Sequence, residues 1–170
     1  MNYPVRKLLR LRNHDYSSES IYYVTICAEG RQYLFGYKQY DEIIYSPIGL
    51  VVRESWERIA SIYEGILLDE FIVMPNHIHG IIVYENSEKD EKIKPLDRVI
   101  RNFKSFTTHE YYKDISRPTP NLWERGYYER IIRYNELDSI RDYIRNNIPN
   151  WENDRFFTLE MNYRASLHSE

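Results

Sequence analysis

The segment MPNHIHG, residues 74–80, constrains the fold more than any other part of the chain. Apolar and largely β-branched runs flank it at residues 71–73 and 81–83. The region therefore predicts either two antiparallel strands that turn at its Pro-Asn pair, or one strand with a break at that point. Both alternatives place the two histidines of the segment on a strand.

Side chains two residues apart in a strand point to the same face, so His77 and His79 present two imidazoles side by side while Ile78 faces the core. Neutral imidazole is the commonest protein ligand for divalent transition metals. The pair could therefore supply half of a metal site that a remote third ligand completes. The alternative is two half-exposed histidines on a solvent face, and the spacing alone does not decide between them.

The length of 170 residues suits one domain with a single core, and we expect residues 1–170 to form one catalytic-type domain. Residues 1–20 are interpreted as an irregular arm and residues 151–170 as a C-terminal tail. A hydrophobic content of 42% and a charged content of 29% are typical of a soluble globular protein. Without a long apolar run or a signal-like N-terminus, we expect no membrane span and a cytoplasmic location.

The chain contains 17 tyrosines and has a formal net charge of -3. Tyrosine rings can stack on bases or contact phosphates, although they can equally fill a small core. A negative net charge argues against non-specific binding to duplex DNA but leaves room for a local basic face. The candidate residues for phosphate contacts lie on a predicted helix and in the arm. The alternative is that they only form a solvated surface. They are Arg98, Arg101 and Lys104 on the helix and Arg6, Lys7, Arg10 and Arg12 in the arm.

Periodicity and turn residues predict strands and helices in an α+β order. Ser46 is expected to cap the first helix and Asn135 the last, with Gly65 and Pro149 marking their ends. The single cysteine, Cys27, is expected to be a small buried hydrophobe. Together these elements predict an antiparallel sheet with helices packed on it, of the ferredoxin-like kind. The expected strands are 21–28, 33–35, 42–45, 66–74, 77–84 and 122–133, and the expected helices are 47–65, 95–112 and 135–148.

On the last predicted helix Tyr143 and Asn147 are four residues apart and share one face. A tyrosine in this position is usually a packing residue. Next to a metal-bound phosphate, however, its hydroxyl is a competent nucleophile that forms a covalent phosphotyrosine. Asn147 offers an uncharged oxygen that could serve as a third ligand beside the two histidines.

The sequence resembles the REP-associated tyrosine transposases, a family within the HUH superfamily of single-strand DNA nucleases and transposases. The resemblance implies an HUH endonuclease-like fold and cleavage of single-stranded DNA next to hairpins, with Mg²⁺ or Mn²⁺. It implies that His77 and His79 bind the metal, that Tyr143 is the nucleophile and holds the 5′ phosphate, and that Asn147 assists the metal. The matching segments are residues 16–27, 74–79, 102–105, 123–133 and 143–147.

The chain departs from the family pattern in one place, because Ile148 separates Asn147 from Pro149. This could shift the third ligand to Asn146. Three other functions compete with the transposase interpretation: a nuclease in which a metal-bound water attacks, a domesticated protein that binds hairpin or single-stranded DNA without cleaving it, and an RNA-binding module. The histidine pair argues against the last, since base stacking needs no metal ligands. The expected assembly is a monomer or a homodimer.

Overall fold

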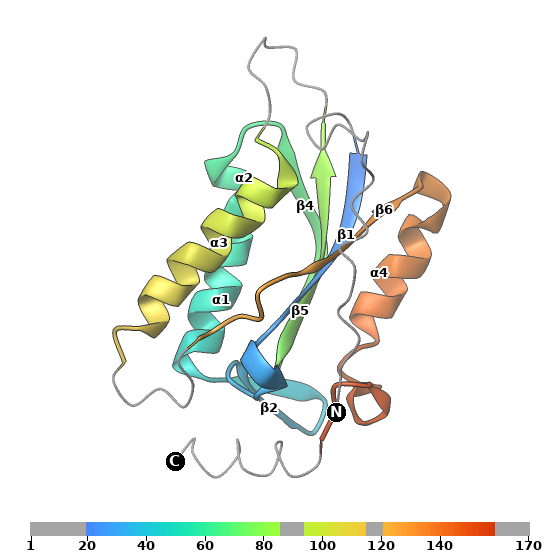
Figure 1. Ribbon diagram of the computed structural model, residues 1–170. Helices are drawn as coiled ribbons and strands as arrows, with labels where there is room; N and C mark the ends of the chain where they lie inside the picture. Colours follow the sequence, from blue (N-terminus) through green and yellow to red (C-terminus); the bar gives the residue numbers. More distant parts are fainter. Residues whose placement is uncertain (1–19, 86–93, 115–120, 159–170) are drawn as a thin grey trace, which may run out of the picture.

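Four antiparallel strands form the main sheet in the computed structural model, which describes residues 20–85, 94–114 and 121–158 (Figure 1). Their order across the sheet is β4-β5-β1-β6. A separate two-stranded hairpin follows β1 in the chain. The strands of the main sheet are β1 (Ser20–Cys27), β4 (Ile66–Met74), β5 (His77–Tyr84) and β6 (Tyr128–Ile132), and those of the hairpin are β2 (Gly36–Gln39) and β3 (Glu42–Tyr45).

Among the described residues, four α-helices cover the main sheet on both faces. The α1 and α3 helices lie on one face and α4 on the other (Figure 1). Without the β2–β3 hairpin and the short α2, the chain order up to β6 is βαββαβ, which confirms the ferredoxin-like α+β prediction. The helices are α1 (Pro47–Glu57), α2 (Ile59–Ile62), α3 (Leu96–Tyr111) and α4 (Leu137–Arg145), and three 3₁₀ turns occupy Glu29–Arg31, Tyr134–Glu136 and Trp151–Asn153.

The central segment forms a hairpin, so β4 and β5 are two antiparallel strands and not one interrupted strand. Their bounds are those predicted from the sequence, and β1 pairs with β5 along its whole length. A bulge interrupts β4, because the register shifts between Leu68 and Phe71. The two histidines therefore lie on a strand that has hydrogen-bonded neighbours on both sides.

The larger core lies between the sheet and the α1 and α3 helices. Trp56 of α1 is fully buried there and lies directly over Gly80 of β5. A Cβ atom added at Gly80 would come within 2.3 Å of the Trp56 ring, so only glycine leaves room for the indole at this position. Ile78 and Ile82 of the same strand also belong to this core, as the alternation of a strand requires.

The first predicted segments differ from the structure in two places. No strand forms at residues 33–35, where the side chains of Tyr33, Leu34 and Phe35 are buried in the core without strand pairing. The strand β2 begins after them, at Gly36. The helix expected over 47–65 is interrupted at Arg58, which separates α1 from α2. Its start is confirmed, because the Gly49 backbone N–H donates to the Ser46 hydroxyl at 3.1 Å.

The later segments also differ in extent. The strand expected over 122–133 is confined to β6, and Trp123 makes only an isolated bridge to Ala28. The last helix is not capped by Asn135, which lies inside a 3₁₀ turn before α4. Instead, the Glu136 carboxylate accepts a hydrogen bond from the Arg133 backbone N–H at 2.9 Å, which satisfies one backbone donor at the N-terminal end of this helical segment.

Three further expectations concern single segments. Cys27 is buried and forms no disulfide, as predicted. Within the described residues, we find no helix that is long and apolar enough to cross a bilayer. The arm of residues 1–20 lies outside the described residues except for Ser20, which begins β1. The predicted tail does not start at residue 151, because Trp151 and Phe156 are buried against the domain.

Candidate active site

The two histidines lie side by side on β5, on the face of the sheet that α4 and residues 151–158 cover (Figure 1). Their ring centroids are 4.5 Å apart. The exposed fractions of His77 and His79 are 0% and 1%, so the alternative of two half-exposed histidines on a solvent face is wrong. The reason is tertiary, since the Trp151 and Phe156 rings pack against the His77 ring, with centroid distances of 5.8 and 4.8 Å.

One nitrogen of His77 is hydrogen-bonded and the other is not. Nδ1 lies 2.8 Å from the side-chain oxygen of Asn76. Nε2 is buried and has no hydrogen-bond partner among the described residues. An imidazole nitrogen that is buried without a partner is a feature that a bound metal ion would explain.

Hydroxyl groups surround His79. The hydroxyls of Tyr23 and Thr25, both on β1, lie 2.7 and 2.8 Å from its Nδ1. The register of the sheet produces this contact, because Thr25 pairs directly with His79. On the other side of the ring, the Tyr143 hydroxyl lies 3.4 Å from Nε2.

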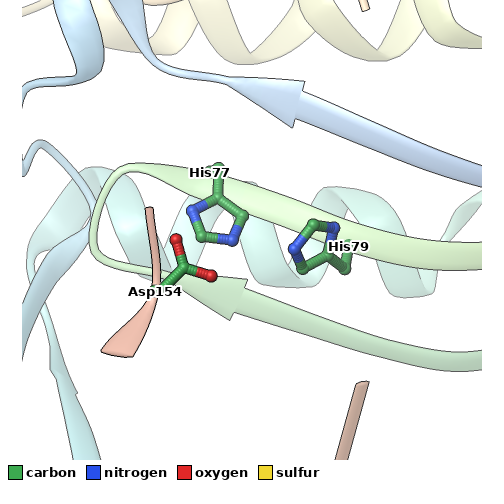
Figure 2. Close-up of side chains that lie close together, drawn as sticks. All are labelled: His77, His79 and Asp154. Atoms are coloured by element: carbon green, nitrogen blue, oxygen red, sulfur yellow. The ribbon is translucent and has the colours of Figure 1, made fainter. Parts of the chain in front are cut away.

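The third residue of the cluster is Asp154, which follows the last 3₁₀ turn. Figure 2 shows its carboxylate directed at the His77 ring, with His79 next along the strand. One ligand atom from each of these three residues lies within 4.8 Å of the other two. Ligand atoms that share one ion at about 2.1 Å each stand at most about 4.2 Å apart, so a small closure would suffice.

Sequence reasoning did not identify Asp154, because it lies in the segment interpreted as a C-terminal tail. The signal that could have found it is the apolar pattern around it. Trp151 and Phe156 are large enough to anchor the segment, and both are buried beside His77. Because both anchors pack beside His77, Asp154 between them also lies at this site.

The expected third ligand, Asn147, is buried and lines the same groove as Asp154 and Tyr143. Its side-chain nitrogen donates to the Tyr143 backbone carbonyl at 2.7 Å. The alternative, Asn146, is exposed and donates in the same way to the Asp142 carbonyl, also at 2.7 Å. Of these two asparagines, Asn147 is buried and Asn146 is exposed, so Asn147 is the better candidate for the third ligand.

Tyr143 is half exposed and can therefore be reached from solvent. It lies on α4 and lines a groove of about 450 Å³, to which four asparagines also contribute. Tyr143 and Asp154 both line this groove. Its lining residues are Ser139, Asp142, Tyr143, Asn146, Asn147, Asn150, Asn153, Asp154 and Arg155.

Burial sets the protonation of the site. It lowers the pKa of His79 to about 3 and the pKa of His77 well below its ordinary value, so both rings are neutral and can donate a lone pair to a metal. Burial, and then the negative charge of Asp154, raises the pKa of the Tyr143 hydroxyl. A cation bound beside it would act in the opposite direction on this hydroxyl.

The predicted basic residues lie away from this cluster. Arg98, Arg101 and Lys104 are on α3, which covers the opposite face of the sheet (Figure 1). Arg101 pairs with Asp97 at 3.1 Å, and the Lys104 amino group donates to two backbone carbonyls of residues 124–126. Burial lowers the pKa of Lys104. The basic residues of the arm, including Arg10 and Arg12, lie outside the described residues.

Comparisons with known proteins give a family match and a shared fold. The family model described as "Transposase IS200 like" matches residues 22–147. An uncharacterized protein of Haemophilus influenzae is 31% identical over 89% of this chain and 93% of its own length. The structure of a REP-associated tyrosine transposase bound to a REP hairpin is similar with a TM-score of 0.58 and 16% identity, over 91% of this chain and 86% of the other. At that identity the likeness shows a shared fold.

Proposed function

Because this chain belongs to the IS200-like transposase family, we propose that it cuts and rejoins single-stranded DNA next to hairpins through a covalent phosphotyrosine. The observation that carries the proposal is the 3.4 Å distance between the Tyr143 hydroxyl and His79 Nε2. A half-exposed nucleophile and a buried ligand pair thereby share one site, although 64 residues separate them in the chain.

In the proposed reaction, the phenolic oxygen of Tyr143 attacks the phosphorus of a DNA phosphodiester. A bond forms between that oxygen and the phosphorus, and the bond to the 3′ oxygen breaks. The phenolic proton is lost, and the leaving strand takes up a proton as its 3′-hydroxyl. The 5′ phosphate stays on the tyrosine, so attack by a 3′-hydroxyl reverses the step and rejoins DNA strands.

We propose that His77, His79 and Asp154 hold a divalent metal ion. The residues fit such an ion, because His77 Nε2 is a buried nitrogen without a partner and two neutral imidazoles with one carboxylate are a common donor set. Imidazole suits Mn²⁺ better than Mg²⁺, which prefers oxygen ligands. When bound, the ion would polarise the phosphate and offset negative charge on the Tyr143 oxygen. Asn147, which lines the same groove as Asp154 and Tyr143, stays a candidate to assist this site.

Hairpin DNA is the proposed partner, and the structural neighbour described above was itself bound to a REP hairpin. We propose that the groove beside Tyr143 receives the strand to be cut, since the proposed nucleophile Tyr143 and the candidate ligand Asp154 both line it. Arg98, Arg101 and Lys104, together with Arg10 and Arg12, stay candidates for phosphate contacts. A monomeric or homodimeric state and a cytoplasmic location also stay predictions.

The test is incubation of the protein with a labelled single-stranded hairpin oligonucleotide and Mn²⁺, followed by a denaturing gel. The unmodified protein should produce cut DNA and a covalent protein–DNA adduct. Tyr143→Phe should lose both while it keeps hairpin binding, because the change removes one hydroxyl and leaves the ring. Tyr128→Phe is the matched control, since this tyrosine is 45% exposed against 48% for Tyr143, and its ring also contacts Tyr23.

Each result separates the competing functions. Continued cutting by Tyr143→Phe would mean that a metal-bound water attacks and that the protein is a hydrolytic nuclease. An adduct that depends on Tyr128 would move the nucleophile to β6. Hairpin binding without any cutting by the unmodified protein would identify a DNA-binding protein.

A further inference from the structure

Asn76 occupies the turn between β4 and β5, immediately before His77, and its exposed fraction is 1%. The backbone of this turn is held on both sides. The Asn76 carbonyl accepts the Ala28 N–H at 2.8 Å, and the Pro75 carbonyl accepts the Phe35 N–H at 2.9 Å. The Asn76 side chain therefore projects from a fixed backbone.

The contacts of the Asn76 amide determine which way it faces. Its nitrogen donates to the backbone carbonyl of Phe156 at 2.9 Å and to that of Arg31 at 3.2 Å. These two bonds use both amide hydrogens. A flipped amide would place its oxygen against two carbonyl oxygens, so the oxygen must face His77.

This orientation selects one tautomer of His77. The Asn76 oxygen can only accept, so the His77 Nδ1 atom 2.8 Å away must carry the proton that it donates. His77 Nε2 is then left with an unshared lone pair. That nitrogen is the one that is buried without a partner among the described residues.

The same amide also holds the segment that contributes Asp154. The Phe156 carbonyl, which accepts from Asn76, belongs to a residue whose N–H donates to the Asp154 carboxylate at 2.7 Å. The Phe156 ring lies 4.8 Å from the His77 ring, and the Arg31 guanidinium lies 3.9 Å from the Phe156 centroid. One side chain thus connects two candidate ligands that are distant in the sequence.

We propose that Asn76 is a positioning residue for the metal site. It directs the Nε2 lone pair of His77 toward the ion and holds the Asp154 segment against it. This inference rests on the metal site of the proposed function. Partners that orient a ligating histidine generally matter for metal affinity, since they fix both the tautomer and the orientation of the ring.

The first test is the tautomer of His77 in metal-free protein without DNA, read from long-range ¹H–¹⁵N correlation spectra of the imidazole nitrogens. We expect the proton on Nδ1. A proton on Nε2 in the unmodified protein would overturn the inference without any variant. Because neither metal nor DNA is present, this measurement is independent of whether the protein cuts DNA.

The second test compares Asn76→Ala with Asn102→Ala. Asn102 is the matched control, since its amide also donates a hydrogen bond, to the Tyr63 hydroxyl at 2.8 Å, but on an exposed surface of α3. Asn76→Ala should remove the preference for the Nδ1 proton and lower the affinity for Mn²⁺, measured by calorimetry, by roughly 10- to 100-fold. Asn102→Ala should change neither. An unaltered tautomer and Mn²⁺ affinity in folded Asn76→Ala would overturn the proposal.

Discussion

The two faces of the main sheet have different compositions, although β5 contributes side chains to both. Toward α1 and α3 it directs Ile78 and Ile82 into a continuous apolar core. Toward α4 it directs His77 and His79 into a cluster of hydroxyl and carboxylate groups. Strand alternation permits this division, because neighbouring residues never share a face. A single strand can therefore support the core and the candidate site separately.

The two faces are also held together differently. The α1 and α3 helices pack by apolar burial, with Trp56 and Phe103 in edge-to-face contact at 5.4 Å. The α4 helix adds ion pairs to a smaller apolar cluster, because Arg141 binds the Asp69 carboxylate at 2.8 Å and Arg145 binds Glu70. Both acceptors lie in the bulge of β4. The bulge is thus the place where the site-bearing helix is attached to the sheet edge.

The largest expected effect is a loss of stability from the apolar face. Trp56→Ala removes a fully buried indole, and we expect the free energy of unfolding to fall by about 3–5 kcal/mol. Denaturant titration measures this change. Cleavage per folded molecule should stay at the level of the unmodified protein, because Trp56 lies on the far side of the sheet from His79. A loss of cleavage beyond the folded fraction would show that the two faces are coupled.

The complementary change on the other face should affect activity more than stability. His79→Ala removes a proposed metal ligand, and metal stabilisation of several kcal/mol in the transition state corresponds to a loss of roughly 10²- to 10³-fold in cleavage rate. We expect the free energy of unfolding to fall by about 1–3 kcal/mol, because the change leaves the buried hydroxyls of Tyr23 and Thr25 without this partner. Rate and stability are measured on the same preparation. Retention of metal-dependent cutting would contradict the assignment of His79.

The smallest expected effect is a loss of stability at low pH, which arises from the buried histidines on the α4 face. Burial lowers the pKa of His79 from 6.5 to about 3, so the unfolded chain binds a proton at pH values where the folded protein does not. Stability is therefore complete above pH 6.5 and falls as the pH drops below it. The expected slope is about 1.4 kcal/mol per pH unit for each buried histidine. His79→Ala should reduce the slope by that amount between about pH 6.5 and pH 5, as measured by denaturant titration, and an unchanged slope would contradict the prediction.

The elements that sequence reasoning identified correctly have strong local signals. The bounds of β4 and β5 follow from two apolar runs around a Pro-Asn turn, and the start of α1 follows from Ser46 before Pro47. Where the local signal was ambiguous, the prediction failed. Residues 33–35 have strand-like side chains, but they are buried in the core as irregular chain before β2 begins.

Part of the site could be predicted from the sequence for the same reason, because local spacing determines it. The spacing of His77 and His79 predicts two rings on one face of a strand, and the (i, i+4) spacing predicts Tyr143 and Asn147 on one face of a helix. Nothing in that spacing says which layer covers the histidines. Their burial depends on Trp151 and Phe156, which reach the site from more than 70 residues away in the chain.

The sequence by itself determined the alternation of β5, the order of the βαββαβ elements and the identity of the histidine pair, because these depend on residues within a few positions of one another. Only the tertiary structure decided that Tyr143 meets His79, that Asp154 lies beside the two histidines, and that Arg31 and Phe156 fix the Asn76 amide. The physical reason is that metal ligands and nucleophiles must converge within a few ångströms. That convergence is set by packing between distant segments, which no local pattern encodes.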